Sequence, residues 1–99
     1  MKYKIDYSLL AEINLEKILL YIAKESGDKE VARKFFSELT EKISILAENP
    51  YLFNFPSEDI LRYKGKRQLV FGNYNVYFSI NEKKKQVQIA TIRHGARVR

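Results

Sequence analysis

Two stretches in the first half of the chain repeat apolar residues at every third or fourth position, which is the spacing of one helix face. The first covers residues 9–25, and the second covers residues 29–48 and ends before Pro50, whose ring cannot continue a helix. The stripe residues are Ala11, Leu15, Ile18, Leu19 and Ile22 in the first stretch, and Ala32, Phe35, Phe36, Leu39, Ile43, Leu46 and Ala47 in the second. Gly27 suits a helix end and Asp28 a helix N-cap, so the two helices should form an antiparallel hairpin. Because both stripes need a common apolar surface to cover, the hairpin predicts a sheet.

Alternation of apolar and polar residues indicates the strands of that sheet. The expected strands, in chain order, are residues 2–8, 66–71, 74–80 and 86–94. Gly72-Asn73 is a two-residue hairpin signal, the charged residues 81–85 form a second turn, and residues 50–64 are expected to be an irregular connection. The predicted fold class is α+β with the order β-α-α-β-β-β, an antiparallel-rich sheet with an α-helical hairpin packed on one face. We expect residues 1–99 to form a single domain.

The strand expected at 74–80 divides its side chains between the two faces of the sheet. Val76 and Phe78 should face the helices, whereas Asn75 and Tyr77 should face away from them. We expect the second face to stay open, at least in part, and to carry basic side chains. Such a face is a suitable place for a large ligand.

The composition limits the chemistry that the chain can perform. The chain has no cysteine and a single histidine, which excludes a disulfide framework, a thiolate nucleophile and a cysteine-based metal site. No apolar run approaches the roughly 18–20 residues that span a membrane, and the N-terminus lacks the apolar core of a signal peptide. We therefore expect a cytoplasmic protein with no cofactor, no metal and no membrane partner.

Charge is divided unevenly along the chain. Residues 1–60 carry eight Lys or Arg against eleven Asp or Glu, a net of −3, whereas residues 61–99 carry ten against one, a net of +9. The single acid of the second half is Glu82. This asymmetry favours an anionic partner at the C-terminal half, either a nucleic acid or an acidic protein, over a basic surface that serves only solubility.

The order of motifs resembles that of a known family. A helical hairpin ends in ENP (48–50), a basic strand and a tyrosine-rich strand follow in GKRQLVFGNYNVYFSI (65–80), and the chain closes on IATIRHGARVR (89–99). Together these motifs resemble the RelE/ParE superfamily, the toxins of bacterial type II toxin–antitoxin systems, which include plasmid-stabilisation proteins. The HGAR ending (94–97) is closer to the ParE side. The resemblance implies a small cytosolic toxin that a cognate antitoxin keeps silent by wrapping its helices and sheet.

The resemblance also implies two kinds of target and two sets of site residues. RelE-like members cut mRNA on the ribosome, and in that case the catalytic residues would be His94, Arg67 and Arg97. ParE-like members inhibit DNA gyrase, and a target- or phosphate-binding surface would use Arg67, Tyr77, Arg93 and Arg97. Each residue also has a purely structural interpretation, as a surface histidine, a solvated strand face or a loose terminus.

Two positions depart from the ribonuclease branch. Val70 and Asn75 stand where that branch usually has arginine. The leading hypothesis is therefore a ParE-like toxin that inhibits growth by binding DNA gyrase. The alternative is a RelE-like ribosome-dependent mRNA endoribonuclease, and a nucleic-acid-binding module without toxic action is a third hypothesis. Under either toxin hypothesis, the antitoxin should occupy the apolar groove beside the helical hairpin and part of the basic sheet.

Overall fold

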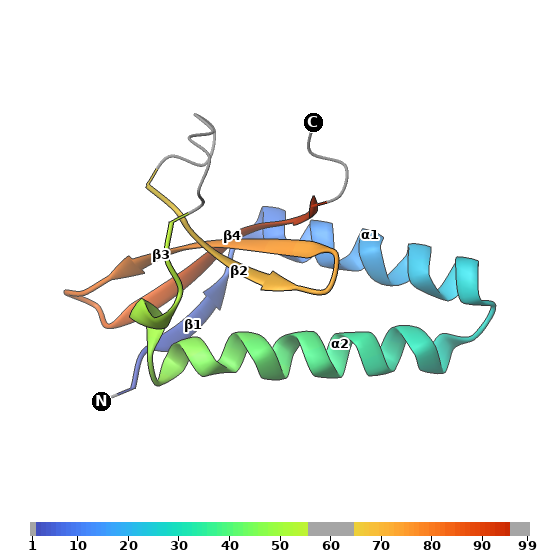
Figure 1. The fold of residues 1–99 in the computed structure, drawn as a ribbon, viewed down its shortest axis with the longest axis horizontal. Helices are drawn as coiled ribbons and strands as arrows, with labels where there is room; N and C mark the ends of the chain where they lie inside the picture. Colours follow the sequence, from blue (N-terminus) through green and yellow to red (C-terminus); the bar gives the residue numbers. More distant parts are fainter. Residues whose placement is uncertain (1, 56–64, 96–99) are drawn as a thin grey trace.

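The computed structural model describes residues 2–55 and 65–95, and its elements follow the predicted order (Figure 1). They are β1 (Lys4–Tyr7), α1 (Leu9–Ser26), α2 (Lys29–Ser44), the 3₁₀ turns η1 (Ile45–Ala47) and η2 (Pro50–Leu52), β2 (Arg67–Phe71), β3 (Tyr74–Asn81) and β4 (Gln86–His94). The α+β class and the β-α-α-β-β-β order are confirmed. The connection expected at 50–64 begins with η2, and residues 56–64 lie outside the described residues.

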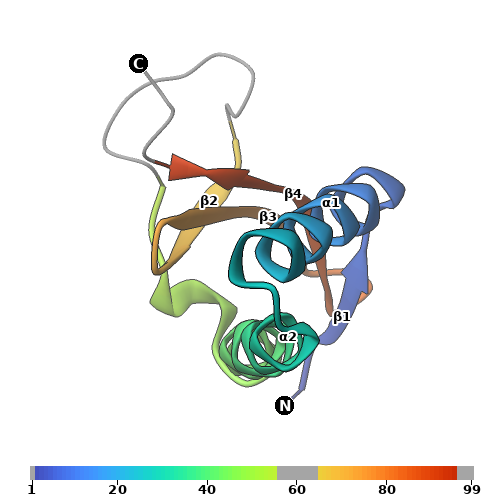
Figure 2. The same cartoon turned by 90° about the vertical axis from the view of Figure 1, so that its right-hand side faces the viewer.

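The four strands form one mixed sheet in the order β1-β4-β3-β2. Strands β2, β3 and β4 are an antiparallel meander, and Gly72 takes a φ of 58° in the predicted turn between β2 and β3. Strand β1 pairs in parallel with β4, so the first and last strands of the chain are neighbours. Figure 2 looks along both helices and shows them on the same side of the sheet. The sheet is therefore antiparallel except at the edge that β1 forms.

Local signals fix the ends of the helical hairpin. The side-chain oxygen of Ser8 accepts a hydrogen bond from the backbone N–H of Ala11 at 3.0 Å and caps α1. Gly27 ends α1 in the left-handed conformation, with a φ of 70°. Asp28 then accepts a hydrogen bond from the backbone N–H of Glu30 at 2.9 Å. The predicted glycine stop and aspartate cap are both confirmed.

Helix α2 ends earlier than the sequence predicts. The α-helix stops at Ser44 rather than at residue 48, and a 3₁₀ turn follows. The backbone N–H groups of Glu48 and Asn49 both donate to the carbonyl of Ile45, which tightens the last turn. Leu46 nevertheless stays fully buried. The apolar pattern thus continues past the α-helix, and only the winding of the backbone changes.

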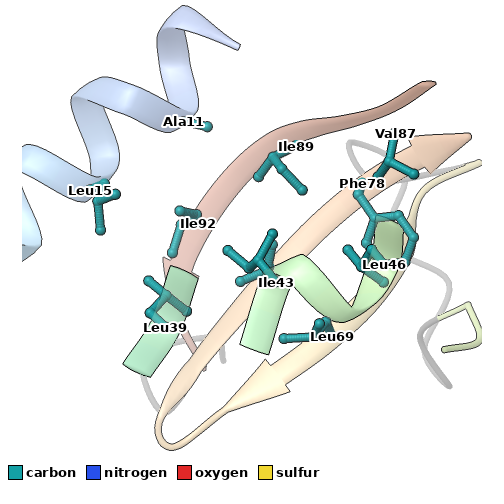
Figure 3. Close-up of a cluster of buried hydrophobic side chains, with 11 residues drawn as sticks. Ala11, Leu15, Leu39, Ile43, Leu46, Leu69, Phe78, Val87, Ile89 and Ile92 are labelled. Atoms are coloured by element: carbon teal, nitrogen blue, oxygen red, sulfur yellow. The ribbon is translucent and has the colours of Figure 1, made fainter. Parts of the chain in front are cut away.

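The core lies between the helical hairpin and the sheet (Figure 3). Its most deeply buried side chains are Ala11, Leu39, Ile43, Leu46, Leu69, Val76, Phe78, Val87, Ile89 and Ile92. Ile89 and Ile92 both belong to the core although they are three residues apart. The pairing register shifts between Tyr77 and Phe78, which leaves Ala90 as an extra residue in β4. This bulge decides which residues at the end of β4 face the helices.

One residue of the α2 stripe does not enter the core. The ring of Phe35 meets Phe71 and Tyr74 edge-on, with ring centroids 5.5 Å and 5.3 Å apart. Phe36 is 42% exposed and lines a groove between α1 and α2. Adjacent residues of a helix point about 100° apart, so both rings cannot face the sheet. The expectation of core packing is correct for Phe35 and wrong for Phe36.

Candidate functional site

A cleft of about 360 Å³ opens where β4 ends, between α1 and the end of the sheet. It is lined by Asn14, Lys17, Ile18 and Tyr21 from α1, by Tyr74 from β3, and by Ile92, Arg93 and His94 from β4. Its volume is within the range of about 300–1,000 Å³ that is typical of ligand sites. Two of the predicted site residues, Arg93 and His94, therefore lie at one cleft.

Helix α1 forms a wall of the cleft because it is bonded to the free edge of β4. Strand β1 pairs with β4 only as far as Ile89. Beyond that point, Asn14 Oδ1 on α1 accepts hydrogen bonds from Thr91 Oγ1 at 2.6 Å and from the backbone N–H of Ile92 at 3.1 Å. A single side chain thus replaces the missing strand partner and holds the next turn of α1 against the end of β4.

His94 lies on the helix side of the sheet at the end of an aromatic row. Its ring packs edge-on against Tyr74 with centroids 5.0 Å apart, and Tyr74 in turn packs against Phe35. The Nδ1 atom of His94 is buried and has no hydrogen-bond partner in the described part of the chain. Buried polar atoms of this kind are rare and often mark a functional position.

Arg67, the second predicted catalytic residue, lies far from this cleft. In the sheet register Arg67 pairs with Phe78, whereas His94 pairs with Tyr74. Four residues of β3 separate the two pairs, which corresponds to about 13 Å along the strand. The structure does not bring Arg67 and His94 into one catalytic site, which joint catalysis by these two residues would require.

The contacts of Arg67 are instead structural. Its guanidinium donates a hydrogen bond to the carbonyl of Phe53 at 3.0 Å. It also lies over two aromatic rings, 4.5 Å from the centroid of Phe55 and 5.1 Å from that of Tyr51. These contacts hold η2 and the residues after it to the start of β2.

The outer face of the sheet is less open than the sequence predicts. Tyr77 is only 2% exposed, and it lies on a central strand, where it pairs with Gln68 and Thr91. Asn75 Nδ2 donates to its hydroxyl oxygen at 3.4 Å. The expectation that Tyr77 stands on an open face is wrong, since a ring buried this deeply offers no surface on which a base can stack.

One row of the outer face carries the positions that depart from the ribonuclease branch. Val70, Asn75 and Arg93 are aligned across β2, β3 and β4 by the strand register. Val70 is 54% exposed, and Arg93 is exposed as well. Arg93 is therefore the single cation of this row, because Val70 and Asn75 stand where the ribonuclease branch usually has arginine.

A polar cluster forms at the opposite end of the sheet, around Glu82 in the turn between β3 and β4. The hydroxyls of Tyr3 and Tyr51 both donate to Glu82 Oε2, and Lys85 Nζ lies 2.7 Å from Oε1. The hydrogen bond from Lys85, followed by those from the two tyrosines, lowers the pKa of Glu82 to about 2. The hydrogen bond to Glu82 raises the pKa of Tyr51 to about 12. The cluster joins Tyr3, just before β1, to Tyr51 of η2 and to the turn through one carboxylate.

Three further predictions concern Arg97, metal binding and membrane helices. Arg97 lies outside the described residues. Within residues 2–55 and 65–95, no three His, Asp or Glu side chains are grouped so that they could hold a metal ion. No helix of the described ranges has the length and apolar character to cross a membrane.

Asn14, Lys17 and Tyr21 line the cleft but are not predicted site residues. Their spacing of three and four residues is nevertheless a signal, since it places them on one side of α1 beside the apolar stripe. The apolar stripe indicates that the side of α1 next to it, which carries these three residues, lies near the core. The sequence does not predict what this side contacts, because that depends on the position of α1 along the edge of β4.

The model of the family of ParE toxins of type II toxin–antitoxin systems (parDE) matches residues 5–99. The chain belongs to this family. The predicted membership of the RelE/ParE superfamily, closer to its ParE side, is therefore confirmed for this ParE-family chain. A comparison with curated protein sequences returns no match.

Solved structures of toxins share the fold of this ParE-family chain. The chromosomal ParDE system from P. aeruginosa gives a TM-score of 0.77 at 18% identity, covering 94% of this chain and 96% of that one. The RelBE2 toxin–antitoxin complex from Mycobacterium tuberculosis gives 0.67 at 17% identity, covering 95% and 92%. The isolated E. coli RelE toxin gives 0.59 at 13% identity, covering 97% and 87%. At these identities the likeness shows a shared fold and leaves the target open.

Proposed function

We propose that this chain inhibits growth by binding DNA gyrase in the cytoplasm, and that a cognate antitoxin neutralises it. The family match over residues 5–99 carries the proposal. The separation of Arg67 from His94 supports binding over RNA cleavage, because general acid–base chemistry needs its groups within hydrogen-bond reach of one substrate. Val70 and Asn75 point the same way, since neither can neutralise charge that develops on phosphate.

The helical hairpin offers a surface for the antitoxin. A groove of about 420 Å³ between the two helices is lined by Glu12, Leu15, Glu16, Leu19, Leu20 and Phe36. Large apolar side chains continue along the outer face of α1, where Leu9 is 72% exposed, Leu20 65% and Ile13 41%. A helix that is apolar on both faces is usually covered on both. This supports an antitoxin segment with an apolar face that lies over α1.

A supercoiling assay tests the proposed target. Purified chain added to gyrase and relaxed plasmid should inhibit supercoiling, and prior addition of the cognate antitoxin should restore it. If the chain leaves supercoiling unchanged and instead cuts mRNA on translating ribosomes, the gyrase proposal is wrong.

A second candidate is a ribosome-dependent mRNA endoribonuclease, and the buried, unpartnered Nδ1 of His94 favours it. The cleft sets this imidazole near Lys17 and Arg93, which supply cations for a phosphate group. Under this mechanism, His94→Ala should abolish growth inhibition and leave antitoxin binding intact. Unchanged growth inhibition in that variant would rule the mechanism out.

A further inference from the structure

Two basic residues line the cleft at the end of β4, and neither is paired with an acidic residue of the described chain. Lys17 lines it from α1, and Arg93, whose register position is on the outer face, lines it from the free edge of β4; both residues are exposed. Neither forms an ion pair with any described residue, and the described lining of the cleft contains no Asp or Glu. Two unpaired cations on different walls favour an occupant that carries negative charge.

The remainder of the cleft is mostly apolar. Ile92 is 2% exposed at its inner side, Ile18 is half-buried, and the ring of Tyr74 lies beside them. The imidazole of His94 adds one buried nitrogen without a described partner. The lining therefore suits a short group that combines methylene carbons with a charged, hydrogen-bonding end.

Helix α1 presents opposite charges on its two sides. The groove toward α2 has Glu12 and Glu16 on its rim, whereas the cleft toward β4 has Lys17 and Arg93. A segment that crosses α1 is therefore repelled if it places an acidic side chain in the groove, and it is attracted if it places that side chain in the cleft. Such an arrangement of charge selects one direction of binding.

We propose that this cleft is the anchor site for an acidic side chain of the antitoxin, with its carboxylate between Lys17 and Arg93 and a neighbouring apolar residue against Ile18 and Ile92. The inference rests on the proposed function for the identity of the partner. A polynucleotide fits the cleft less well, because phosphate backbones are bound by rows of cations with exposed stacking platforms. Among the residues that the structure describes, only two cations line the cleft, and Tyr74 is half-buried within an aromatic row.

The test uses His94 as a reporter, since the only histidine of the chain gives one set of imidazole NMR signals. The full chain is titrated with two capped tripeptides, acetyl-Leu-Glu-Leu amide and its Gln analogue. The Glu peptide should shift the His94 signals in a saturable manner and bind about tenfold more tightly than the Gln peptide. Lys17→Gln and Arg93→Gln should each weaken the Glu peptide by about threefold. Lys34→Gln removes an exposed cation of α2 outside the cleft and should change nothing.

Three outcomes overturn the proposal. They are equal affinity for the two peptides, no peptide-dependent change of the His94 signals, and a stronger response of these signals to adenosine monophosphate, which would assign the cleft to nucleotides. The titration measures binding and not growth inhibition. A failure of the cleft proposal is therefore distinguishable from a failure of the gyrase proposal, which the supercoiling assay reports.

Discussion

Gly95 lies where there is no room for a side chain, and this steric restriction explains the glycine. Its N–H donates to the carbonyl of Asn73 at 2.6 Å, and a Cβ at this position would lie 2.8 Å from Asn75 Nδ2 and 3.3 Å from Asn75 Cγ. The half-buried Asn75 has little room to move, because it bonds to the hydroxyl of Tyr77. The glycine thus lets the chain that leaves β4 pass directly over an amide of β3.

We expect Gly95→Ala to lower the free energy of unfolding by about 1–3 kcal/mol, the usual range for overpacking. Urea denaturation followed by circular dichroism measures this change. A second substitution, Asn75→Ala, removes the atoms that the new methyl group would meet. In the double variant the loss should be smaller than the sum of the two single losses, and strict additivity would contradict the steric explanation.

The side chain of Asn14 links α1 to β4 through two hydrogen bonds. Asn14→Ala should destabilise the protein by about 2–3 kcal/mol, because it leaves the Thr91 hydroxyl and the Ile92 N–H without their acceptor. Asn14→Asp keeps an oxygen at the same place and serves as the matched control. Thermal unfolding should therefore rank the aspartate variant above the alanine variant, and the reverse order would show that the amide oxygen is not the stabilising atom.

At the scale of elements, α1 is unusual for a surface helix because both its inner and its outer face carry large apolar side chains. Its inner face carries Ala11 and Leu15 into the core, and its outer face exposes Leu9, Ile13 and Leu20. Helix α2 is more typical, with a largely polar outer face around its buried stripe. The contrast indicates that α1, and not α2, is the main surface for a partner.

We expect Leu20→Glu to weaken antitoxin binding by at least about tenfold, because it places a charge in an apolar contact next to Glu16. Stability should change by no more than about 0.5 kcal/mol, since Leu20 is 65% exposed. Isothermal titration calorimetry measures the affinity. Leu52→Glu is the control, because Leu52 has a similar exposure of 60% but lies in η2. Equal losses of affinity for both variants would contradict the assignment to α1.

The turn between β3 and β4 is fixed by a carboxylate whose titration is predictable. The pKa of Glu82 falls from its ordinary value of 4.5 to about 2 in the folded protein. The folded state therefore binds fewer protons than the unfolded state, and the stabilisation by Glu82 is complete above about pH 4.5. It is lost as the pH falls through about 2.

Glu82→Gln isolates this contribution. The difference in unfolding free energy between the wild type and the variant should be present at pH 7, shrink below about pH 4.5 and be gone near pH 2. Urea denaturation across this pH range provides the measurement. A difference that stays constant with pH would mean that Glu82 acts through its shape and not through its charge.

At the scale of the whole molecule, charge is separated between the two halves of the chain. The first 60 residues carry a net of −3 and the rest a net of +9. Because the basic half forms the meander and the acidic half contains both helices, a partner that covers both must itself be divided in charge. The opposite charges of the groove and the cleft on α1 repeat this division on a smaller scale.

Antitoxin association should therefore depend on ionic strength. Raising NaCl from about 50 mM to 500 mM shortens the Debye length from roughly 14 Å to 4 Å, and the association rate constant should fall about tenfold or more. The dissociation rate constant should change less, since the proposed contacts over α1 are apolar. Stopped-flow fluorescence separates the two, and an association rate that does not respond to salt would contradict electrostatic steering.

Periodicity, caps and turn signals determined most of the fold from the sequence alone. The helical hairpin, the Gly27 stop, the Asp28 cap, the Gly72 turn and the order β-α-α-β-β-β are local features, and each depends on residues that are close together in the chain. The family resemblance was readable for the same reason, because its motifs are contiguous segments.

Only the tertiary structure decided where the functional groups meet. Parallel pairing of β1 with β4, the bulge at Ala90 and the position of α1 along the free edge of β4 bring Lys17 beside His94, and they keep Arg67 apart. Tyr77 is buried in the folded chain, although alternation alone places it on an open face. These outcomes depend on strand order and register, which are set by contacts between residues distant in sequence, and no local pattern encodes them.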